Sequence, residues 1–304
     1  MRLHVLGSGS KGNAAVVQAP GGAVLIDCGF NKKTLAERLA QAAVDPASIR
    51  GILITHEHSD HVAGLGVVLR GWQKLGIEVP VYTTEKTRRA AQIFNEIHAT
   101  SELRSFKPME TFALAGMSIT AFPTSHDAAE PVGFRIEGAK EGAGESLGEC
   151  EGQGVGESLT QGARERTGQG VAQDVETGAC AASTQVIGYM TDTGQLTGEA
   201  RELLQGCHIL ALETNHDAHM LQAGPYPYQL KHRVASSRGH LSNMQAAEAL
   251  QEILSNNTQC VVGMHLSQIN NEPHLPRRAL EEIIARNTHG ARVLVASQFQ
   301  AVDA

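Results

Sequence analysis

Residues 55–61, Thr-His-Glu-His-Ser-Asp-His, constrain the fold of this chain more than any other stretch. They follow the apolar run 51–54, which predicts a buried strand, and they precede residues 62–75, which we expect to be helical. The segment therefore lies on a loop at a strand end, where functional side chains are commonly displayed. In an extended segment residues i and i+2 project to the same side, so His56 and His58 can bind one ion together.

Two further residues of this segment, Asp60 and His61, come round the turn and can face a second ion beside the first. Neutral imidazole nitrogens and carboxylate oxygens are ligands that Zn, Mn and Fe accept. The alternative is a solvated, histidine-rich loop, but four potential ligands at this spacing rarely come together by chance. The segment therefore predicts a metal site.

The order His-x-His-x-Asp-His after an apolar strand resembles the metallo-β-lactamase superfamily. That family is a four-layer αββα sandwich that holds one or two metal ions at one edge, so the resemblance implies a single such domain over residues 1–304. It also implies further ligands at strand ends later in the chain, which are His126, Asp192 and His265. A strand-end acid, Asp27, is expected to orient a metal-binding histidine or to hold the motif loop.

The resemblance divides the ligands between two ions. One ion is assigned to His56, His58 and His126, the other to Asp60, His61 and His265, with Asp192 as the bridge. Two divalent ions (Zn, Mn or Fe) about 3.5–4 Å apart can share a water and convert it to a hydroxide nucleophile near neutral pH. This set of ligands favours a hydrolase.

Four motifs are similar to the small bacterial YycJ-like (WalJ-like) branch, which is regarded as metal-dependent 5′-to-3′ DNA exonucleases. They are Gly-Ser-Gly-Ser-Lys-Gly-Asn at 7–13, Asn-His-Asp at 215–217, Gly-His-Leu-Ser-Asn at 239–243 and His-Leu-Ser-x-x-Asn-Asn at 265–271. The resemblance covers nearly the whole chain except residues 138–184. The expected substrate is accordingly nucleic acid, and DNA in particular.

By the same resemblance Asp60 and His240 are expected to be catalytic, and Ser267, Asn270 and Asn271 are expected to bind a terminal phosphate. The glycine-rich loop at 7–13 can bring backbone N–H groups and Lys11 close to a substrate phosphate, or it can be a simple hairpin turn. Residues 226–243 are the most basic stretch of the chain. Their cations (Lys231, Arg233 and Arg238) either hold backbone phosphates or belong to a solvated loop.

Two other functions fit the same residues. The site also suits a small-molecule hydrolase acting on a thioester, lactone or phosphodiester, because this fold hosts many chemistries. A metal-dependent binding or regulatory protein without turnover is the third possibility.

Composition sets broader limits on the chain. A net charge of −7 excludes a global basic footprint for nucleic acid, so such a partner requires a local basic patch. No apolar run approaches the roughly 18 residues of a membrane span, the first residues lack a signal-peptide pattern, and five scattered cysteines contain no Cys-x-x-Cys pair. We therefore expect a cytoplasmic protein without a membrane partner. Residues 138–184 are rich in Gly, Glu, Gln, Ser and Ala, which predicts a flexible insertion between two strands of a hairpin.

Overall fold

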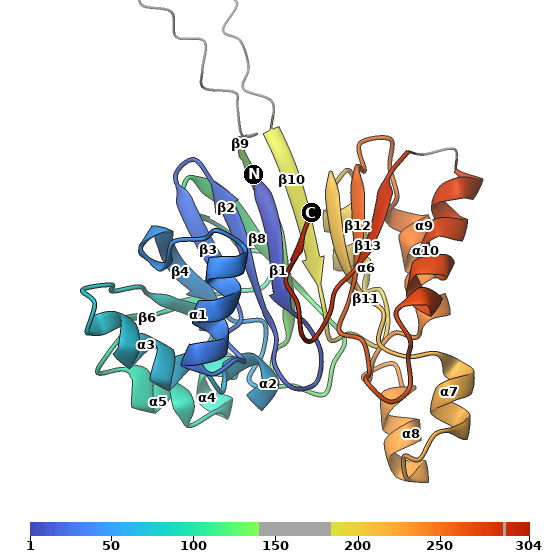
Figure 1. Cartoon of the computed structure of the whole chain (residues 1–304), viewed down its shortest axis with the longest axis horizontal. Helices are drawn as coiled ribbons and strands as arrows, with labels where there is room; N and C mark the ends of the chain where they lie inside the picture. The colour runs from blue at the N-terminus through green and yellow to red at the C-terminus, as the bar shows by residue number, and fades with distance from the viewer. Residues whose placement is uncertain (140–183, 288–289) are drawn as a thin grey trace, which may run out of the picture.

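Two β-sheets face each other at the centre of the molecule, and helices cover the outer face of each (Figure 1). The computed structural model describes residues 1–139, 184–287 and 290–304. The arrangement confirms the predicted four-layer αββα sandwich. The predicted insertion lies outside the described residues, apart from its two edges. There β9 continues through Gly138 and Ala139, and β10 begins at Thr184.

The first sheet contains seven strands in the order β14-β1-β2-β3-β4-β5-β6. Strands β14, β1, β2 and β3 pair antiparallel, whereas β3, β4, β5 and β6 run parallel. Their bounds are β1 Arg2–Gly7, β2 Ala14–Ala19, β3 Gly22–Ile26, β4 Ile49–Leu53, β5 Val81–Thr84, β6 Leu103–Phe106 and β14 Val302–Asp303.

The second sheet has the order β13-β12-β11-β10-β9-β8-β7. Strands β7 to β10 form an antiparallel meander, and β10 to β13 run parallel. Their bounds are β7 Thr111–Leu114, β8 Met117–Pro123, β9 Val132–Ala139, β10 Thr184–Met190, β11 Ile209–Glu213, β12 Cys260–Met264 and β13 Arg292–Val295. The pairing of Thr184 with Ala139 shows that β9 and β10 are hairpin neighbours, as the sequence predicted.

The helices pack on the outside of the sheets, with α1 and α3–α5 near the first sheet and α6, α9 and α10 near the second (Figure 1). Their bounds are α1 Lys32–Gln41, α2 Ser59–Val62, α3 Leu65–Gln73, α4 Glu85–Ala90, α5 Ile93–Ile97, α6 Gly198–Leu204, α7 Ala218–Ala223, α8 Tyr228–Val234, α9 Asn243–Ile253 and α10 His274–Arg286, with a 3-10 turn at Pro46–Ser48. None of the helices in the described part of the chain combines the length and the hydropathy needed to span a bilayer.

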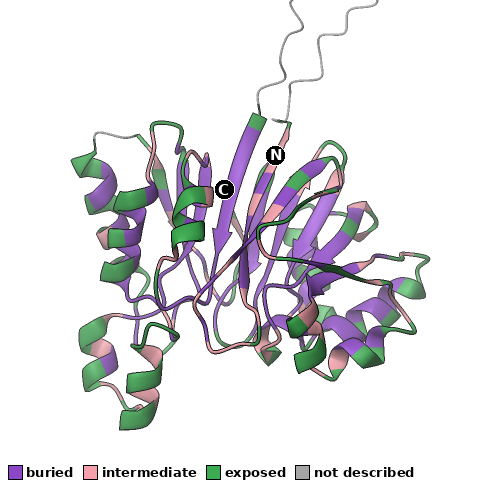
Figure 2. Ribbon diagram, turned by 180° about the vertical axis from the view of Figure 1, so that it is seen from behind, coloured by how far each residue is buried: buried purple, intermediate pink, exposed green. Residues whose placement is uncertain are grey.

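Three apolar clusters hold the layers together: one between the sheets and one between each sheet and its helices. Figure 2 shows the strands buried along most of their length. Neighbouring residues of one strand point to opposite faces, so Val24 packs between the sheets and Leu25 packs under the helices. Both faces are therefore covered, which explains why these strands are continuous apolar runs rather than alternating ones.

Two helices are shorter than their sequences suggest. The helix expected over residues 62–75 is α3, Leu65–Gln73, and it is separated from the short helix α2 of the motif by Ala63 and Gly64; an added Cβ at Gly64 would collide with the backbone carbonyl of Phe30. Residues 85–97 form two short helices, α4 and α5, rather than one, because Ala91 adopts an extended conformation (φ −126°, ψ 132°). These boundaries shorten the helices but do not change the layers.

The strand ends determine where functional side chains gather. Strands β3 and β4 run parallel in one sheet, and β8, β10, β11 and β12 share one direction in the other. Parallel strands bring their carboxyl ends to one edge. The loops that follow these six strands meet at the end of the sandwich that carries α2 (Figure 1).

Candidate metal centre

The motif loop, residues 55–61, is held by a buried carboxylate at the end of β3. The two oxygens of Asp27 accept hydrogen bonds from the backbone N–H and hydroxyl of Thr55, and Oδ2 lies 2.8 Å from Nδ1 of His61. Burial lowers the pKa of His61, but Asp27 and the nearby Asp192 and Asp60 outweigh it and hold that pKa well above its usual value. The contact with Asp27 engages Nδ1 and leaves Nε2 of His61 for the centre.

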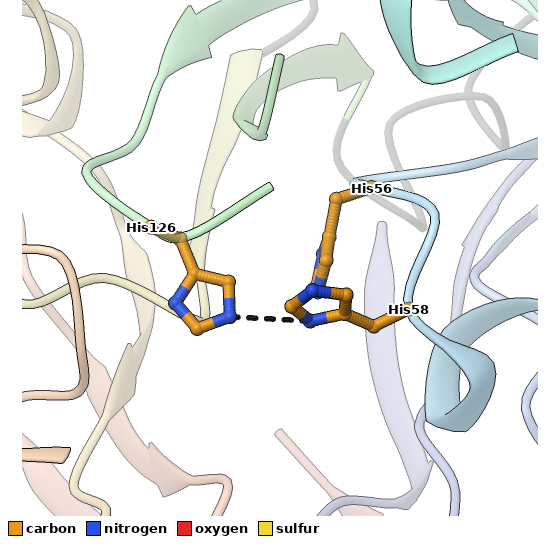
Figure 3. A group of neighbouring side chains, drawn as sticks. All are labelled: His56, His58 and His126. Carbon is orange, nitrogen blue, oxygen red and sulfur yellow. Dashed lines mark hydrogen bonds between the residues drawn. The ribbon is translucent and has the colours of Figure 1, made fainter. Parts of the chain in front are cut away.

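The first group of possible ligands contains three imidazoles, His56, His58 and His126, which converge from the motif loop and the loop after β8 (Figure 3). Each offers one nitrogen, and these nitrogens lie within 4.8 Å of one another. Nε2 of His126 is 3.3 Å from Nδ1 of His58. The other nitrogen of His126 lies 3.0 Å from the carbonyl of Gly239, which fixes the orientation of the ring.

The second group contains Asp60, His61 and His265. Oδ2 of Asp60 lies 3.5 Å from Nε2 of His61 and 3.6 Å from Nε2 of His265. Sequence reasoning missed Asn13, a buried neighbour of this group. Its amide nitrogen donates to Asp60 Oδ2 (3.2 Å) and lies 3.0 Å from Nε2 of His61. The predicted phosphate loop therefore turns its asparagine inward, onto the candidate ligands.

A carboxylate after β10, Asp192, lies between the two groups. Its Oδ2 is 3.2 Å from Nε2 of His61, and its Oδ1 is 3.9 Å from Nε2 of His126. Oδ1 also lies 3.4 Å from His265 Nδ1. Burial raises the pKa of Asp192, but His265 and His61 outweigh that effect and hold the pKa well below its usual value. The ionised carboxylate thus faces histidines of both groups.

Three residues of the centre share an unusual backbone conformation. Asp27 and His265 directly follow β3 and β12, Asp192 follows β10 after one residue, and the three have positive φ angles of 59°, 56° and 52°, respectively. Non-glycine residues rarely adopt this left-handed conformation, and such residues concentrate at functional sites. The sharp turn at each strand end directs the side chain across the edge of the sandwich.

An acid at the end of β11, Glu213, was missed by sequence reasoning. Its Oε1 lies 2.7 Å from Nδ1 of His240 and 2.9 Å from Nδ1 of His265, whereas Oε2 accepts hydrogen bonds from the backbone N–H groups of Thr193 and Leu241. Burial raises the pKa of this carboxyl, but the two histidines outweigh it and lower the pKa. The signal was present in the sequence: like Asp27 and Asp192, this acid ends a buried apolar run.

The predicted catalytic residue His240 lies at the rim of the centre. Its ring centroid is 4.9 Å from that of His126 and 5.2 Å from that of His265, so the structure brings it beside both groups. Burial lowers the pKa of His240, but Glu213 outweighs it and raises the pKa above its ordinary value. The side chain is 19% exposed, whereas that of Glu213 is fully buried, so His240 retains access to solvent.

The structure does not support the predicted phosphate-binding role equally for all four residues. The exposed Lys11 donates its backbone N–H to Gln298, and the hydroxyl of Ser267 accepts hydrogen bonds from the backbone N–H groups of its own turn. The amide of Asn271 is engaged with Asn243 and with the backbone carbonyls of residues 214 and 215. Asn270 is buried. These contacts give Asn271 a structural role and leave Lys11 and Ser267 as the more accessible of the four.

The donor atoms fit divalent metal ions. Nε2 of His56 and Nε2 of His265 are buried and have no hydrogen-bond partner within the described residues, although buried polar atoms normally have one. Each faces other imidazoles or carboxylates of the groups above, which is the donor set that Zn, Mn and Fe accept. Neither His216 nor Asp217 belongs to these groups. The carboxylate of Asp217 caps α7 instead.

The fold and this edge of the sandwich define a class of enzyme. The sequence profile of the metallo-beta-lactamase superfamily matches residues 7–158, half of the 304-residue chain. The chain therefore belongs to the metallo-β-lactamase superfamily and is a hydrolase of that class, as the motif predicted.

Three known proteins are similar over nearly the whole chain. Exodeoxyribonuclease YycJ of Bacillus anthracis is 28% identical over 95% of this chain and 92% of its own length. Exodeoxyribonuclease WalJ of Streptococcus pneumoniae is 28% identical over 96% of this chain and 91% of its own length. Among solved structures, the metallo-beta-lactamase fold protein YhfI from Bacillus subtilis covers 100% of both chains with a TM-score of 0.64 and 14% identity, which is a likeness of fold.

Proposed function

We propose that this protein is a phosphodiester hydrolase that uses two divalent metal ions, and that it acts as a 5′-to-3′ DNA exonuclease. One observation carries the proposal. Two ligand groups of different composition lie on either side of a single buried carboxylate, Asp192. Such a pair of groups supports two adjacent ions better than it supports one structural ion, which takes a single closed set of four ligands.

The first ion is assigned to His56, His58 and His126, and the second to Asp60, His61 and His265. Asp192 is assigned as the bridge because its two oxygens face different groups. When bound, two such ions would lower the pKa of water to near neutrality and offset the charge of a phosphodiester. Asp60 would contribute a carboxylate to the second ion, and Asp27 engages Nδ1 of His61 so that Nε2 would be free to bind it.

The role of His240 is to hold a proton beside the phosphate. Its Nδ1 is engaged by Glu213, so Nε2 is the nitrogen available to a substrate. Because Glu213 raises the pKa of this imidazole, more of it is protonated at neutral pH. A cationic donor at the rim favours a phosphodiester over a neutral ester, since it hydrogen-bonds a phosphate oxygen or protonates the leaving oxygen.

The substrate class rests on similarity along the chain. YycJ and WalJ, each similar over more than nine-tenths of this chain, are named exodeoxyribonucleases, which supports DNA as the polymer and removal of nucleotides from an end. Lys11 and Ser267 are the side chains that we retain as contacts for a terminal phosphate. The metal is Zn, Mn or Fe, the ions that mixed imidazole and carboxylate ligands accept.

We further propose a cytoplasmic location, because a DNA substrate and the free thiols of Cys28, Cys207 and Cys260 suit a reducing compartment. The assignment of residues 1–304 to a single domain, with an insertion at 138–184, remains a prediction.

The test is digestion of 5′-labelled and 3′-labelled DNA and RNA, each single- and double-stranded, with Mn or Zn added. We expect stepwise loss of nucleotides from the 5′ end of DNA. The loss should be abolished in His58→Ala and Asp60→Ala. It should persist in Glu57→Gln, which changes an acid of the same loop whose Oε1 accepts the N–H of Ala129.

Two outcomes would overturn the proposal. Intact nucleic acid alongside hydrolysis of a thioester, a lactone or a small phosphodiester would point to a small-molecule hydrolase. Bound metal without turnover of any substrate would point to a binding protein.

A further inference from the structure

A helical hairpin projects from the end of the sandwich that carries the metal centre. It consists of α7 and α8, which extend beyond the sheets at the end that also bears α2 (Figure 1). The ammonium group of Lys231 in α8 donates to the carbonyl of Gln222 in α7 (2.6 Å), which ties the two helices together. Beside them lies a cavity of about 420 Å³, whose lining includes His216, Leu221, Tyr228 and Lys231.

The hairpin is positively charged, although the protein as a whole is acidic. The whole chain carries a net charge of −7, yet residues 218–247 contain no Asp or Glu and include Lys231, Arg233 and Arg238. Arg233 is paired with Asp127 (2.6 Å), whereas Lys231 and Arg238 bond only backbone carbonyls among the described residues. A local excess of cations on an acidic protein is complementary to a polyanion.

An aromatic ring stands beside these cations. Tyr228 begins α8 and is 75% exposed, although its ring packs edge-on against His232, with a centroid distance of 4.2 Å. A ring this exposed adds little to the apolar core. Exposed aromatic rings along a basic groove are the stacking platforms that bind unpaired bases, whatever the base.

The hairpin is continuous with the metal centre. The guanidinium of Arg238 donates to the carbonyl of His126, and the backbone N–H of His240 donates to the carbonyl of Val234 at the end of α8. His216 lines the cavity and follows β11, the strand that ends in Glu213. The carboxyl end of α8 is therefore joined by hydrogen bonds to the residues that carry His126 and His240.

We propose that α8 and the cavity beside it bind the single-stranded segment of a nucleic-acid substrate, with an unpaired base stacked on Tyr228 and backbone phosphates near Lys231 and Arg238. This inference rests on the proposed function and narrows its substrate class. The enzyme acts on an unpaired strand several nucleotides long, which reaches both the hairpin and the metal centre, rather than on isolated nucleotides.

The test uses the full-length protein loaded with Mn, a short single-stranded oligothymidylate, and bis(p-nitrophenyl) phosphate as a small phosphodiester. Tyr228→Ala should raise KM for the oligonucleotide about 5- to 150-fold, the range of one lost base stack, and by far more than any change with the small substrate. Tyr228→Phe keeps the ring and should restore KM to near the wild-type value. Lys231→Gln should lower the salt dependence of binding by about one counterion.

Two variants serve as matched controls. Leu75→Ala removes another exposed apolar side chain (71%), and Lys33→Gln removes an exposed lysine of α1. Neither should change KM or the salt dependence. An increase in KM for Leu75→Ala with none for Tyr228→Ala would overturn the placement of the nucleic-acid strand.

Binding of the labelled oligonucleotide in EDTA, measured by fluorescence anisotropy, separates this inference from the proposed function. Affinity that depends on Tyr228 in a protein that never cleaves DNA would support the hairpin site and contradict the exonuclease. Wild-type cleavage with equal KM and equal affinity in Tyr228→Ala would overturn the hairpin site and leave the exonuclease intact. A protein that neither binds nor cleaves the oligonucleotide would overturn both the hairpin site and the exonuclease.

Discussion

Replacement of Glu213 by glutamine tests how the centre is assembled. The carboxylate receives four hydrogen bonds: Oε2 accepts from the backbone N–H groups of Thr193 and Leu241, and Oε1 faces Nδ1 of His240 and of His265. A glutamine has one acceptor oxygen and one NH2 group. The backbone N–H groups cannot become acceptors, so the amide oxygen must take the Oε2 position. The NH2 group then faces both imidazoles.

This orientation forces a change of tautomer in the two histidines. Nδ1 of His265 must then accept a hydrogen bond, so the proton moves to Nε2, the atom that faces Asp60 and is assigned to the second ion. A protonated nitrogen cannot bind a metal ion. Loss of an outer hydrogen bond to a metal-binding histidine typically weakens metal affinity about 10- to 100-fold, which corresponds to about 1.4–2.7 kcal/mol.

The assay is the metal content after dialysis against a graded metal buffer, together with a titration of each site. We expect the wild-type protein to retain two ions. Glu213→Gln should lose the ion assigned to Asp60, His61 and His265, because the group of His56, His58 and His126 does not contact Glu213. Glu57→Gln is the matched control, since its amide oxygen can still accept the N–H of Ala129. Equal affinity for both ions in wild type and Glu213→Gln would refute the reasoning, as would an equal loss in Glu57→Gln.

Two further predictions concern stability and the motif loop. Removal of metal by a chelator should lower the melting temperature by about 5–10 °C, because an ion present at about 100 times its Kd stabilises the folded state by about 2.7 kcal/mol. An unchanged melting curve in EDTA would contradict metal binding. Gly29→Ala should lower metal affinity and destabilise the fold by at least about 1–3 kcal/mol, because its Cβ would collide with the carbonyl of Asp60. Gly198→Ala is the control and should have neither effect, because an added Cβ there meets open space. Urea unfolding of the two alanine variants measures the difference, and equal stabilities would disprove the steric argument.

Local sequence was sufficient for the parts of the centre that are adjacent in the chain. Residues 55–61 carry four of the assigned ligands, and each of the later candidates lies within three residues of the end of a strand that its apolar run identifies. The four-layer fold followed from resemblance to a family with the same motif, and the structure confirms it. Adjacent residues and strand ends are local properties, which is why they could be predicted.

The residues of the centre that the sequence did not identify depend on contacts between distant elements. Glu213 resembles other strand-end acids, but its partners His240 and His265 come later in the chain, and they meet it only because β11 lies between β10 and β12. Asn13 lies in a loop that resembles a phosphate-binding turn, yet it is drawn inward by Asp60. No helix was predicted over α8, because none of its residues is buried and it carries no apolar stripe.

Both sheets supply residues to the candidate metal centre, so contacts at this edge also join the two sheets. The first sheet supplies Asp27 and the motif loop, and the second supplies Asp192 and His265. Polar contacts cross between the sheets at this edge, among them the 3.2 Å approach of Asp192 to His61 and the hydrogen bond from the backbone N–H of His265 to the hydroxyl of Ser8.

The three strand-end residues of this edge, Asp27, Asp192 and His265, also have left-handed backbones, each of which costs about 1–3 kcal/mol. Such strain persists only where the surrounding contacts offset it. Ligands from both sheets that share ions would provide that compensation, because each metal–ligand bond would join one sheet to the other. The metal site and the closure of the sandwich at this end are therefore one energetic unit, and a substitution that weakens either should weaken both.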